Sequence, residues 1–122
     1  MKTFLLVLGM ILMFASCVEG QTTYKNISKQ DLVNVLKGEN VQLVDVRTPA
    51  EYDQGAIKGA ILIDFWNENF LSTIRKKLDK NKPVYLYCKV GGRSSNAAKL
   101  LVNNGFKKVY SLDGGYSSWI QK

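Results

Sequence analysis

Short apolar runs alternate along the chain with longer stretches in which apolar residues recur every three or four positions. The runs at residues 42–46, 60–63, 84–87 and 109–112 predict four short strands. The helical spacing predicts helices over 29–37, over 64–80 and from Ser94 onward, with shorter helical segments at 49–54 and 116–120. This alternation predicts an α/β domain with a mainly parallel central sheet and helices on both faces, a three-layer architecture.

Several residues mark where these helices begin and end. Ser28 is suited to cap the helix at 29–37, and Gly38 to end it. The run Thr48-Pro49-Ala50-Glu51 has the spacing of a capping box, with proline at the first helical position. We expect one folded domain over residues 27–122, preceded by a polar tether at residues 21–26.

The first 20 residues have the pattern of a signal peptide. Lys2 precedes an apolar run over residues 4–15, which is too short to span a membrane. Ala15-Ser16-Cys17 then resembles the lipobox of bacterial lipoproteins, which implies lipidation of Cys17. The alternative is a plain secretory cleavage shortly after Cys17. Either route implies export to the bacterial cell envelope or periplasm. Membrane contact is expected only through the lipid anchor that the first route would provide.

The formal charge is +7, from 17 basic and 10 acidic residues, and the chain contains no histidine. The charge is consistent with solubility, or with attraction of small anions or an anionic membrane surface. The lysines are scattered and no basic block interleaves with aromatic residues, so no nucleic-acid partner is expected. Without histidine, a Ser-His-Asp triad, a Cys-His pair and histidine-based metal sites are excluded. We expect no metal and no organic cofactor.

Cys88 stands where a predicted strand ends and a helix begins, and it is a candidate nucleophile. The glycines that follow, Gly91 and Gly92, allow the backbone N–H groups to curl into an anion-binding nest. The positive end of the helix and the permanent charge of Arg93 add to it. These features favour a thiolate and a lowered pKa at Cys88. The alternative is an inert buried cysteine at a strand end, which the residues that follow disfavour.

Four motifs resemble those of rhodanese-homology domains, in the family's order. The active-site loop of that family is similar to Cys88-Lys89-Val90-Gly91-Gly92-Arg93-Ser94. The other three are the segments at residues 45–52, 55–60 and 112–115, the last with Trp119. The resemblance implies sulfur transfer: Cys88 takes sulfur from a donor such as thiosulfate, holds it as a persulfide and passes it to cyanide or a thiol.

The resemblance also implies roles for the neighbouring residues. The loop from Lys89 through Val90, Gly91 and Gly92 to Arg93 and Ser94 binds the substrate and the persulfide, with Arg93 on the anion. Asp45 and Arg47 are expected to form a structural salt bridge at the strand end. Four residues separate Cys88 from Arg93, whereas related folds acting on phosphate or arsenate have five, so phosphatase-like activity is not expected.

Two positions depart from the family pattern. Ala56 stands where many members have histidine, and Val90 stands where a small polar residue is common. A less polar mouth weakens the expectation of thiosulfate as donor and leaves a thiol persulfide open. Farther along the chain, Phe65, Trp66 and Phe70 are expected in the core rather than at the rim of the site, and Trp119 is expected against the sheet.

The expected partners are a small anionic sulfur donor and a thiol or protein acceptor, with the protein a monomer. Two other functions remain open on the sequence. One is a sulfur-binding or redox module of the cell envelope without turnover. The other is a membrane-tethered interaction protein that uses the fold as a scaffold. The intact loop argues against the first of these, and full function after Cys88→Ala would support the second.

Overall fold

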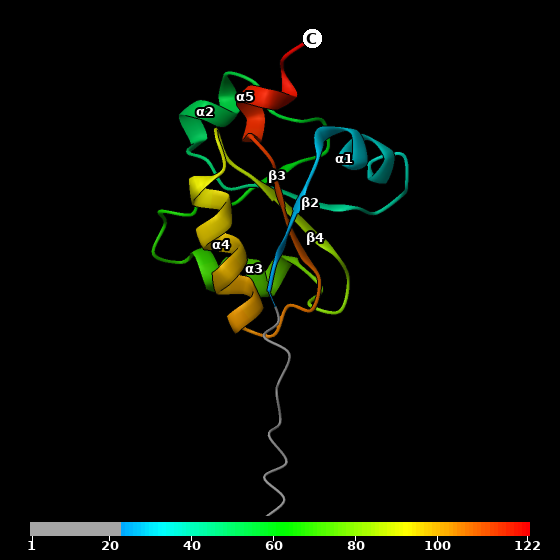
Figure 1. Cartoon of the computed structure of the whole chain (residues 1–122). Helices are drawn as coiled ribbons and strands as arrows, with labels where there is room; N and C mark the ends of the chain where they lie inside the picture. The colour runs from blue at the N-terminus through cyan, green and yellow to red at the C-terminus, as the bar shows by residue number, and fades with distance from the viewer. Residues whose placement is uncertain (1–22) are drawn as a thin grey trace, which may run out of the picture.

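A computed structural model describes residues 23–122, which contain five strands and five helices in alternating order (Figure 1). The strands are β1 (Lys25–Ile27), β2 (Gln42–Asp45), β3 (Ile61–Leu62), β4 (Val84–Tyr87) and β5 (Val109–Leu112). The helices are α1 (Lys29–Val35), α2 (Pro49–Asp53), α3 (Phe70–Lys77), α4 (Gly92–Asn103) and α5 (Gly115–Trp119).

The strands form one sheet in the order β1-β5-β4-β2-β3, and every neighbouring pair is parallel. All five strands therefore end at the same edge of the sheet. In open parallel sheets this carboxyl edge is where ligands bind. Cys88 directly follows β4, near the middle of the sheet, so it lies at this edge.

Each face of the sheet carries its own hydrophobic cluster, as the three-layer prediction requires. Side chains of α3 and α4 pack on one face, with Phe70, Ile74 and Leu101 buried against the strands. Leu32 of α1 packs on the other face, joined by partly buried residues of α5. Along β4, Val84, Leu86 and Cys88 belong to the first cluster, while Tyr85 and Tyr87 face the second. The predicted α/β fold is confirmed.

The helix caps predicted from the sequence are present. The Ser28 hydroxyl accepts the Asp31 N–H, and Thr48 and Glu51 form both bonds of a capping box. These caps satisfy N–H groups that a helix leaves without partners at its start. The box fixes the first turn of α2 directly after β2, which holds Glu51 at the carboxyl edge of the sheet.

The segment preceding the domain differs from the expectation. Residues 25 and 26, predicted to belong to a tether, form β1 with Ile27 and pair with β5. Lys25 and Asn26 are exposed, as polar residues of edge strands usually are, so the apolar pattern of a strand is missing. Only the pairing with β5, more than 80 positions away, defines this strand.

The long helix predicted over 64–80 is shorter in the structure and begins at Phe70. Asp64 accepts the Trp66 N–H and Asn67 accepts the Asn69 N–H through their side chains. Such local bonds offer the backbone an alternative to the helix. The same occurs after α3, where Asp79 accepts the Asn81 N–H. The polar residues that looked compatible with a helix therefore form turns at both ends.

The predicted signal peptide, including Cys17, lies outside the described residues. Within residues 23–122, no helix combines the length and apolar character needed to cross a membrane.

Candidate active site

The sulfur of Cys88 lies inside a turn made by the residues that follow it. The Gly91 N–H donates to Cys88 Sγ over 3.0 Å. Gly91 has φ 120°, a conformation that side-chain-bearing residues rarely adopt, and this lets the chain enter α4 directly after the turn. Gly92 then begins α4, whose positive end lies beside the same sulfur. The nest predicted from the two glycines is therefore formed around Cys88.

Ser94, in the first turn of α4, provides a second contact with the sulfur. Its Oγ lies 3.5 Å from Cys88 Sγ and 2.8 Å from Oγ of Ser111, a buried residue of β5. It also lies 3.2 Å from the Gly91 carbonyl oxygen. A hydroxyl has one proton to donate, so if Ser111 donates to Ser94, the Ser94 proton is free for a Cys88 thiolate. Ser111 was not recognised as a site residue in the sequence.

These contacts act against the effect of burial on Cys88, which is only 1% exposed. Burial raises the pKa of the Cys88 thiol, whereas hydrogen bonds from the Ser94 side chain and from the N–H groups of Ser94, Gly91 and Val90 lower it. The hydrogen bonds prevail, and the pKa of Cys88 lies below its ordinary value. The direction agrees with the expectation, and the thiolate is the nucleophilic form.

Helix α5 holds the other side of the loop. The Tyr116 N–H donates to the Cys88 carbonyl over 2.8 Å, and the Ser117 N–H donates to the Lys89 carbonyl over 3.0 Å. In a trans peptide the C=O and N–H point in opposite directions. The N–H groups that follow these two carbonyls therefore point away from α5, and that of Val90 is among the groups that hydrogen-bond the Cys88 sulfur.

Gly115 is what allows this close approach. A Cβ at this position would lie 2.5 Å from the Cys88 carbonyl oxygen and 2.6 Å from that of Lys89. Both atoms belong to the backbone and cannot turn aside. Gly115, which belongs to the motif at residues 112–115, therefore positions the active-site loop.

Arg93 lies at the mouth of the site, but its charge is directed at Glu51. Its two terminal nitrogens each lie 2.8 Å from a different carboxylate oxygen of Glu51. This two-pronged contact holds the pKa of Glu51 well below its usual range and raises that of Arg93. The guanidinium also lies over the Trp66 ring, 4.8 Å from its centre. Glu51 gave no sign in the sequence of this second role beside its cap.

Trp66 is not a core residue. It is 67% exposed, whereas Phe70 is buried and Phe65 packs against it edge-on. The expectation was wrong for Trp66 because the turn at 64–69 replaces the first part of the helix and directs this ring to the surface beside Arg93. Trp119 packs against the cluster on the α1 and α5 face, as expected.

The side chains of the remaining loop residues do not contact the sulfur. These residues act through their backbone or lie at the surface. Lys89 and Gly92 are exposed, and the Val90 side chain is 66% exposed. Val90 still acts through its N–H, which is among the groups that lower the Cys88 pKa. Val90 and Trp66 are both exposed, and Trp66 lies beside Arg93, so the surroundings of the loop are partly apolar.

Asp45 and Arg47 form a buried ion pair at the end of β2, 2.7 Å between Arg47 Nη2 and Asp45 Oδ2. Arg47 also donates to the Gly55 carbonyl over 2.6 Å and lies over the Tyr116 ring. No bond joins this pair to Cys88, and its contacts tie β2 to the segment after α2 and to α5. Residues 23–122 hold no group of three or more residues arranged to bind a metal ion.

Comparison with known proteins agrees with this geometry. A model of the rhodanese-like domain family matches residues 28–122. The thiosulfate sulfurtransferase GlpE of Shewanella oneidensis is 38% identical over 98 residues, covering 80% of this chain and 94% of that protein. The uncharacterized protein YqhL of Bacillus subtilis is 36% identical over 109 residues, covering 89% and 82%.

A solved structure matches the fold as well. The rhodanese-like domain protein from Staphylococcus aureus has a TM-score of 0.69 and 32% identity, covering 80% of this chain and 93% of that one. The motifs around Cys88, the parallel sheet that presents it and these matches lead to one assignment: the chain belongs to the rhodanese-like domain family.

Proposed function

We propose that this rhodanese-type sulfurtransferase carries sulfur as a persulfide on Cys88. In the first step the Cys88 thiolate attacks the outer sulfur of a donor such as thiosulfate. A bond forms between Sγ and that sulfur while the sulfur–sulfur bond of thiosulfate breaks, and sulfite leaves with the electron pair. The N–H groups of residues 89–93 then stabilise the negative charge of the persulfide.

In the second step an acceptor thiolate or cyanide attacks the outer sulfur of the persulfide. The bond from that sulfur to Sγ breaks, and Sγ takes back the electron pair as a thiolate. The product is a new persulfide or thiocyanate. No proton has to be moved in either step, which suits a site in a chain without histidine. The lowered pKa keeps Cys88 ready to attack.

One observation carries the proposal: the buried Cys88 sulfur accepts the Gly91 N–H at 3.0 Å, and hydrogen bonding outweighs burial in its pKa. An inert buried cysteine would have a raised pKa. The relatives named thiosulfate sulfurtransferase add support for thiosulfate as donor.

The partners and location follow from the same chemistry and from the N-terminal sequence. The donor is a small anion or a thiol persulfide, the acceptor a thiol or protein, and the enzyme a monomer that needs no cofactor. The signal-like residues 1–20 support export to the cell envelope or periplasm, with anchoring through a lipid on Cys17.

Two observations favour a second candidate, a module that holds sulfur or becomes oxidised without turnover. Cys88 is almost fully buried, and both terminal nitrogens of Arg93 are bound to Glu51. In such a module sulfur would load once and leave only when a specific partner opens the site.

Mass spectrometry of the protein after incubation with thiosulfate tests the proposal, with Cys88→Ser as control. The expected result is a gain of one sulfur on Cys88 that cyanide or a thiol removes, with repeated turnover when donor and acceptor are both in excess. Loading without turnover would support the second candidate. A reactive Cys88 that takes no sulfur from thiosulfate or from a persulfide would refute sulfur transfer.

A further inference from the structure

Basic side chains gather at the edge of the sheet opposite to Cys88, where the strands begin. Lys25 opens β1, Lys82 precedes β4, and Lys107 and Lys108 precede β5. The last turn of α3 and the loop after it reach the same end, because the Lys107 N–H donates to the Lys80 carbonyl. This basic end comprises eight exposed residues: Lys25, Arg75, Lys76, Lys77, Lys80, Lys82, Lys107 and Lys108.

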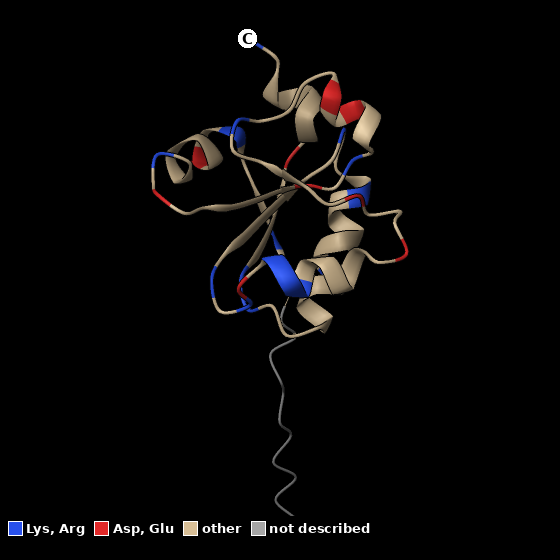
Figure 2. Cartoon of the chain, turned by 180° about the vertical axis from the view of Figure 1, so that it is seen from behind, with Lys and Arg blue, Asp and Glu red and all other residues tan. Residues whose placement is uncertain are grey.

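The charge of the domain is therefore distributed unevenly between its two ends. Segments 75–82 and 104–108 hold seven basic residues and one acidic residue, Asp79. At the other edge, segments 45–53, 88–93 and 113–115 hold three basic and four acidic residues. Figure 2 shows the difference, with the lysines and arginines of α3 and the nearby loops at the lower end of the view. Charges meant only for solubility need not be separated in this way.

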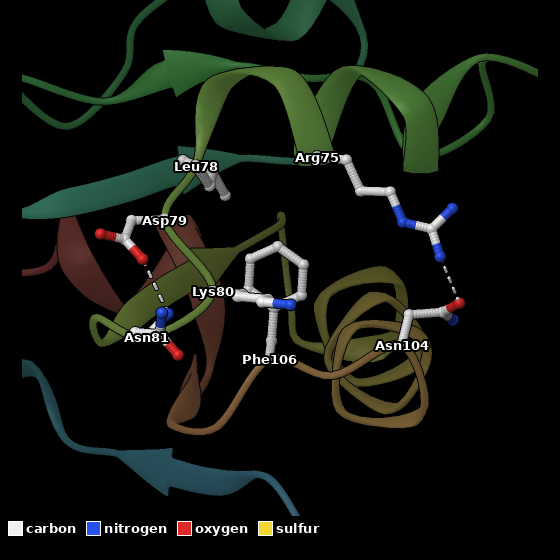
Figure 3. A pocket seen from close by; sticks show the side chains of 7 residues that line it. All are labelled: Arg75, Leu78, Asp79, Lys80, Asn81, Asn104 and Phe106. Carbon is white, nitrogen blue, oxygen red and sulfur yellow. Dashed lines mark hydrogen bonds between the residues drawn. The ribbon is translucent and has the colours of Figure 1, made fainter.

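A hollow of about 520 Å³ opens within the basic end, between the end of α3 and the end of α4 (Figure 3). Leu78 and Phe106 line it, and Arg75 and Lys80 supply two positive charges. Arg75 is held by Asn104 over 3.0 Å. The carboxylate of Asp79 is engaged by the Asn81 N–H over 2.8 Å. The hollow thus combines an apolar floor with cationic walls, which suits the phosphate and the glycerol region of a lipid headgroup.

We propose that the basic end docks on an anionic phospholipid surface, with the Cys88 site facing away from the membrane. Lys and Arg side chains near an anionic bilayer are attracted to its surface over about a Debye length, roughly 8–10 Å. The exposed side chains of this end are polar or basic and include no aromatic ring, so the base stacking by which proteins hold single-stranded nucleic acid is missing. The inference does not depend on the sulfur chemistry.

The N-terminal sequence is consistent with this orientation. Lys25 lies eight positions after Cys17, the candidate lipidation residue, and β1 begins at the basic end. Eight residues span at most roughly 26–29 Å. A lipid on Cys17 would therefore keep the basic end close to the bilayer and raise its effective concentration there.

Docking at this end would leave the active site open to soluble partners. β4 has four residues, which place Cys88 roughly 13 Å beyond the start of that strand. The carboxyl edge of the sheet then faces the aqueous phase, where small anionic donors and protein acceptors diffuse.

Vesicle sedimentation of the full chain tests the proposal, with Cys17→Ser in every variant to exclude lipidation. Vesicles containing phosphatidylglycerol are compared with vesicles of phosphatidylcholine alone. The test variant reverses four charges of the basic end: Lys76→Glu, Lys77→Glu, Lys107→Glu and Lys108→Glu. The control reverses four exposed charges elsewhere: Lys37→Glu, Lys58→Glu, Lys99→Glu and Lys122→Glu. The apolar run at residues 4–15 is present in both variants, so its contribution to vesicle binding cancels when they are compared.

We expect the protein to bind anionic vesicles and salt to weaken this binding. The vesicle affinity should fall at least about tenfold in the test variant and less than about threefold in the control. Equal losses in both variants, or equal binding to both vesicle types, would overturn the proposal. So would equally tight binding to an RNA oligomer. Melting temperatures confirm that both variants are folded. Sulfur loading should be unchanged in them, so a failure here is separable from a failure of sulfur transfer.

Discussion

Glu51 and Arg93 lie 42 positions apart and meet through two parallel hydrogen bonds of 2.8 Å each, at the mouth of the Cys88 site. Glu51 also caps α2, so one carboxylate links the helix after β2 with the helix after β4. Arg93 is therefore positioned and partly neutralised before any substrate arrives. Under the proposed function, this pair would set how much positive charge an anionic donor meets at Arg93.

Replacement of Glu51 by glutamine should strengthen the binding of thiosulfate. Glutamine keeps the capping box, since either residue serves at that position, but it removes the charge that neutralises Arg93. We expect KM for thiosulfate to fall by about threefold or more, equivalent to roughly 0.7 kcal/mol or more, the range of a partly exposed ion pair. Steady-state kinetics measure this. An unchanged KM would mean that Arg93 does not meet the donor.

The stability of the domain should fall with acid through the same carboxylate. Arg93 holds the pKa of Glu51 well below its usual range. A group with a depressed folded pKa contributes stability above its unfolded pKa, about 4.3, and that contribution is lost as pH falls through and below that value. Urea unfolding between pH 7 and pH 3 should show a loss that is smaller in Glu51→Gln. If the free energy of unfolding fell equally with pH in the wild type and in Glu51→Gln, Glu51 would not be the carboxylate responsible.

Removal of either serine hydroxyl near the sulfur should raise the pKa of Cys88. Ser94→Ala removes a direct hydrogen bond that stabilises the thiolate, so the pKa of Cys88 should rise. Ser111→Ala should raise it by less, because Ser111 acts through Ser94. The pH dependence of iodoacetamide alkylation measures both shifts. Ser72→Ala, at an exposed position of α3, is the control. A Ser111→Ala profile identical to that of the wild type would show that Ser111 does not act on Cys88 through Ser94.

Replacement of Gly115 by alanine should damage both stability and sulfur loading. The new Cβ would clash with the backbone of Cys88 and Lys89. The alanine would also have to adopt the positive φ of Gly115. Gly59→Ala is a matched control, because Gly59 also has positive φ but no atom within 4 Å of its Cβ position. We expect a loss of roughly 1–2 kcal/mol for Gly59→Ala from strain alone and roughly 3–4 kcal/mol for Gly115→Ala. Thermal unfolding measures this, at roughly 4–8 °C per kcal/mol. Equal losses would show that the contact with the loop is unimportant.

Features encoded within a few neighbouring residues were predictable from the sequence. The caps at Ser28 and Thr48 and the nest around Cys88 depend on residues only three positions apart, so residue type and spacing suffice. The short apolar runs identified β2, β4 and β5, because each of these strands buries side chains in the two clusters. They identified the edge strand β3 through the buried residues Ala60 and Ile63 on either side of it.

Features that depend on contacts between distant segments could not be predicted in this way. Glu51 meets Arg93 and Ser111 meets Ser94 only after the sheet brings β2, β4 and β5 together. The strand at Lys25–Ile27 has no apolar alternation and depends on β5. Trp66 looked like a core residue because its type favours burial, and the turns that direct it outward compete with a helix only in context.

The position of Cys88 at the end of β4 couples its reactivity to the integrity of the fold. Its sulfur belongs to the same buried cluster as Leu86 and Val84, and its hydrogen-bond partners come from the loop after β4 and the first turn of α4. If the core loosens, the thiol becomes more accessible but also loses the bonds that keep it ionised. Damaged molecules would thus carry an ordinary exposed thiol, less nucleophilic at neutral pH than the native one. Among residues 23–122 Cys88 is the only cysteine. In a sample that carries Cys17→Ser, a single labelling curve against pH would therefore distinguish intact from partly unfolded molecules.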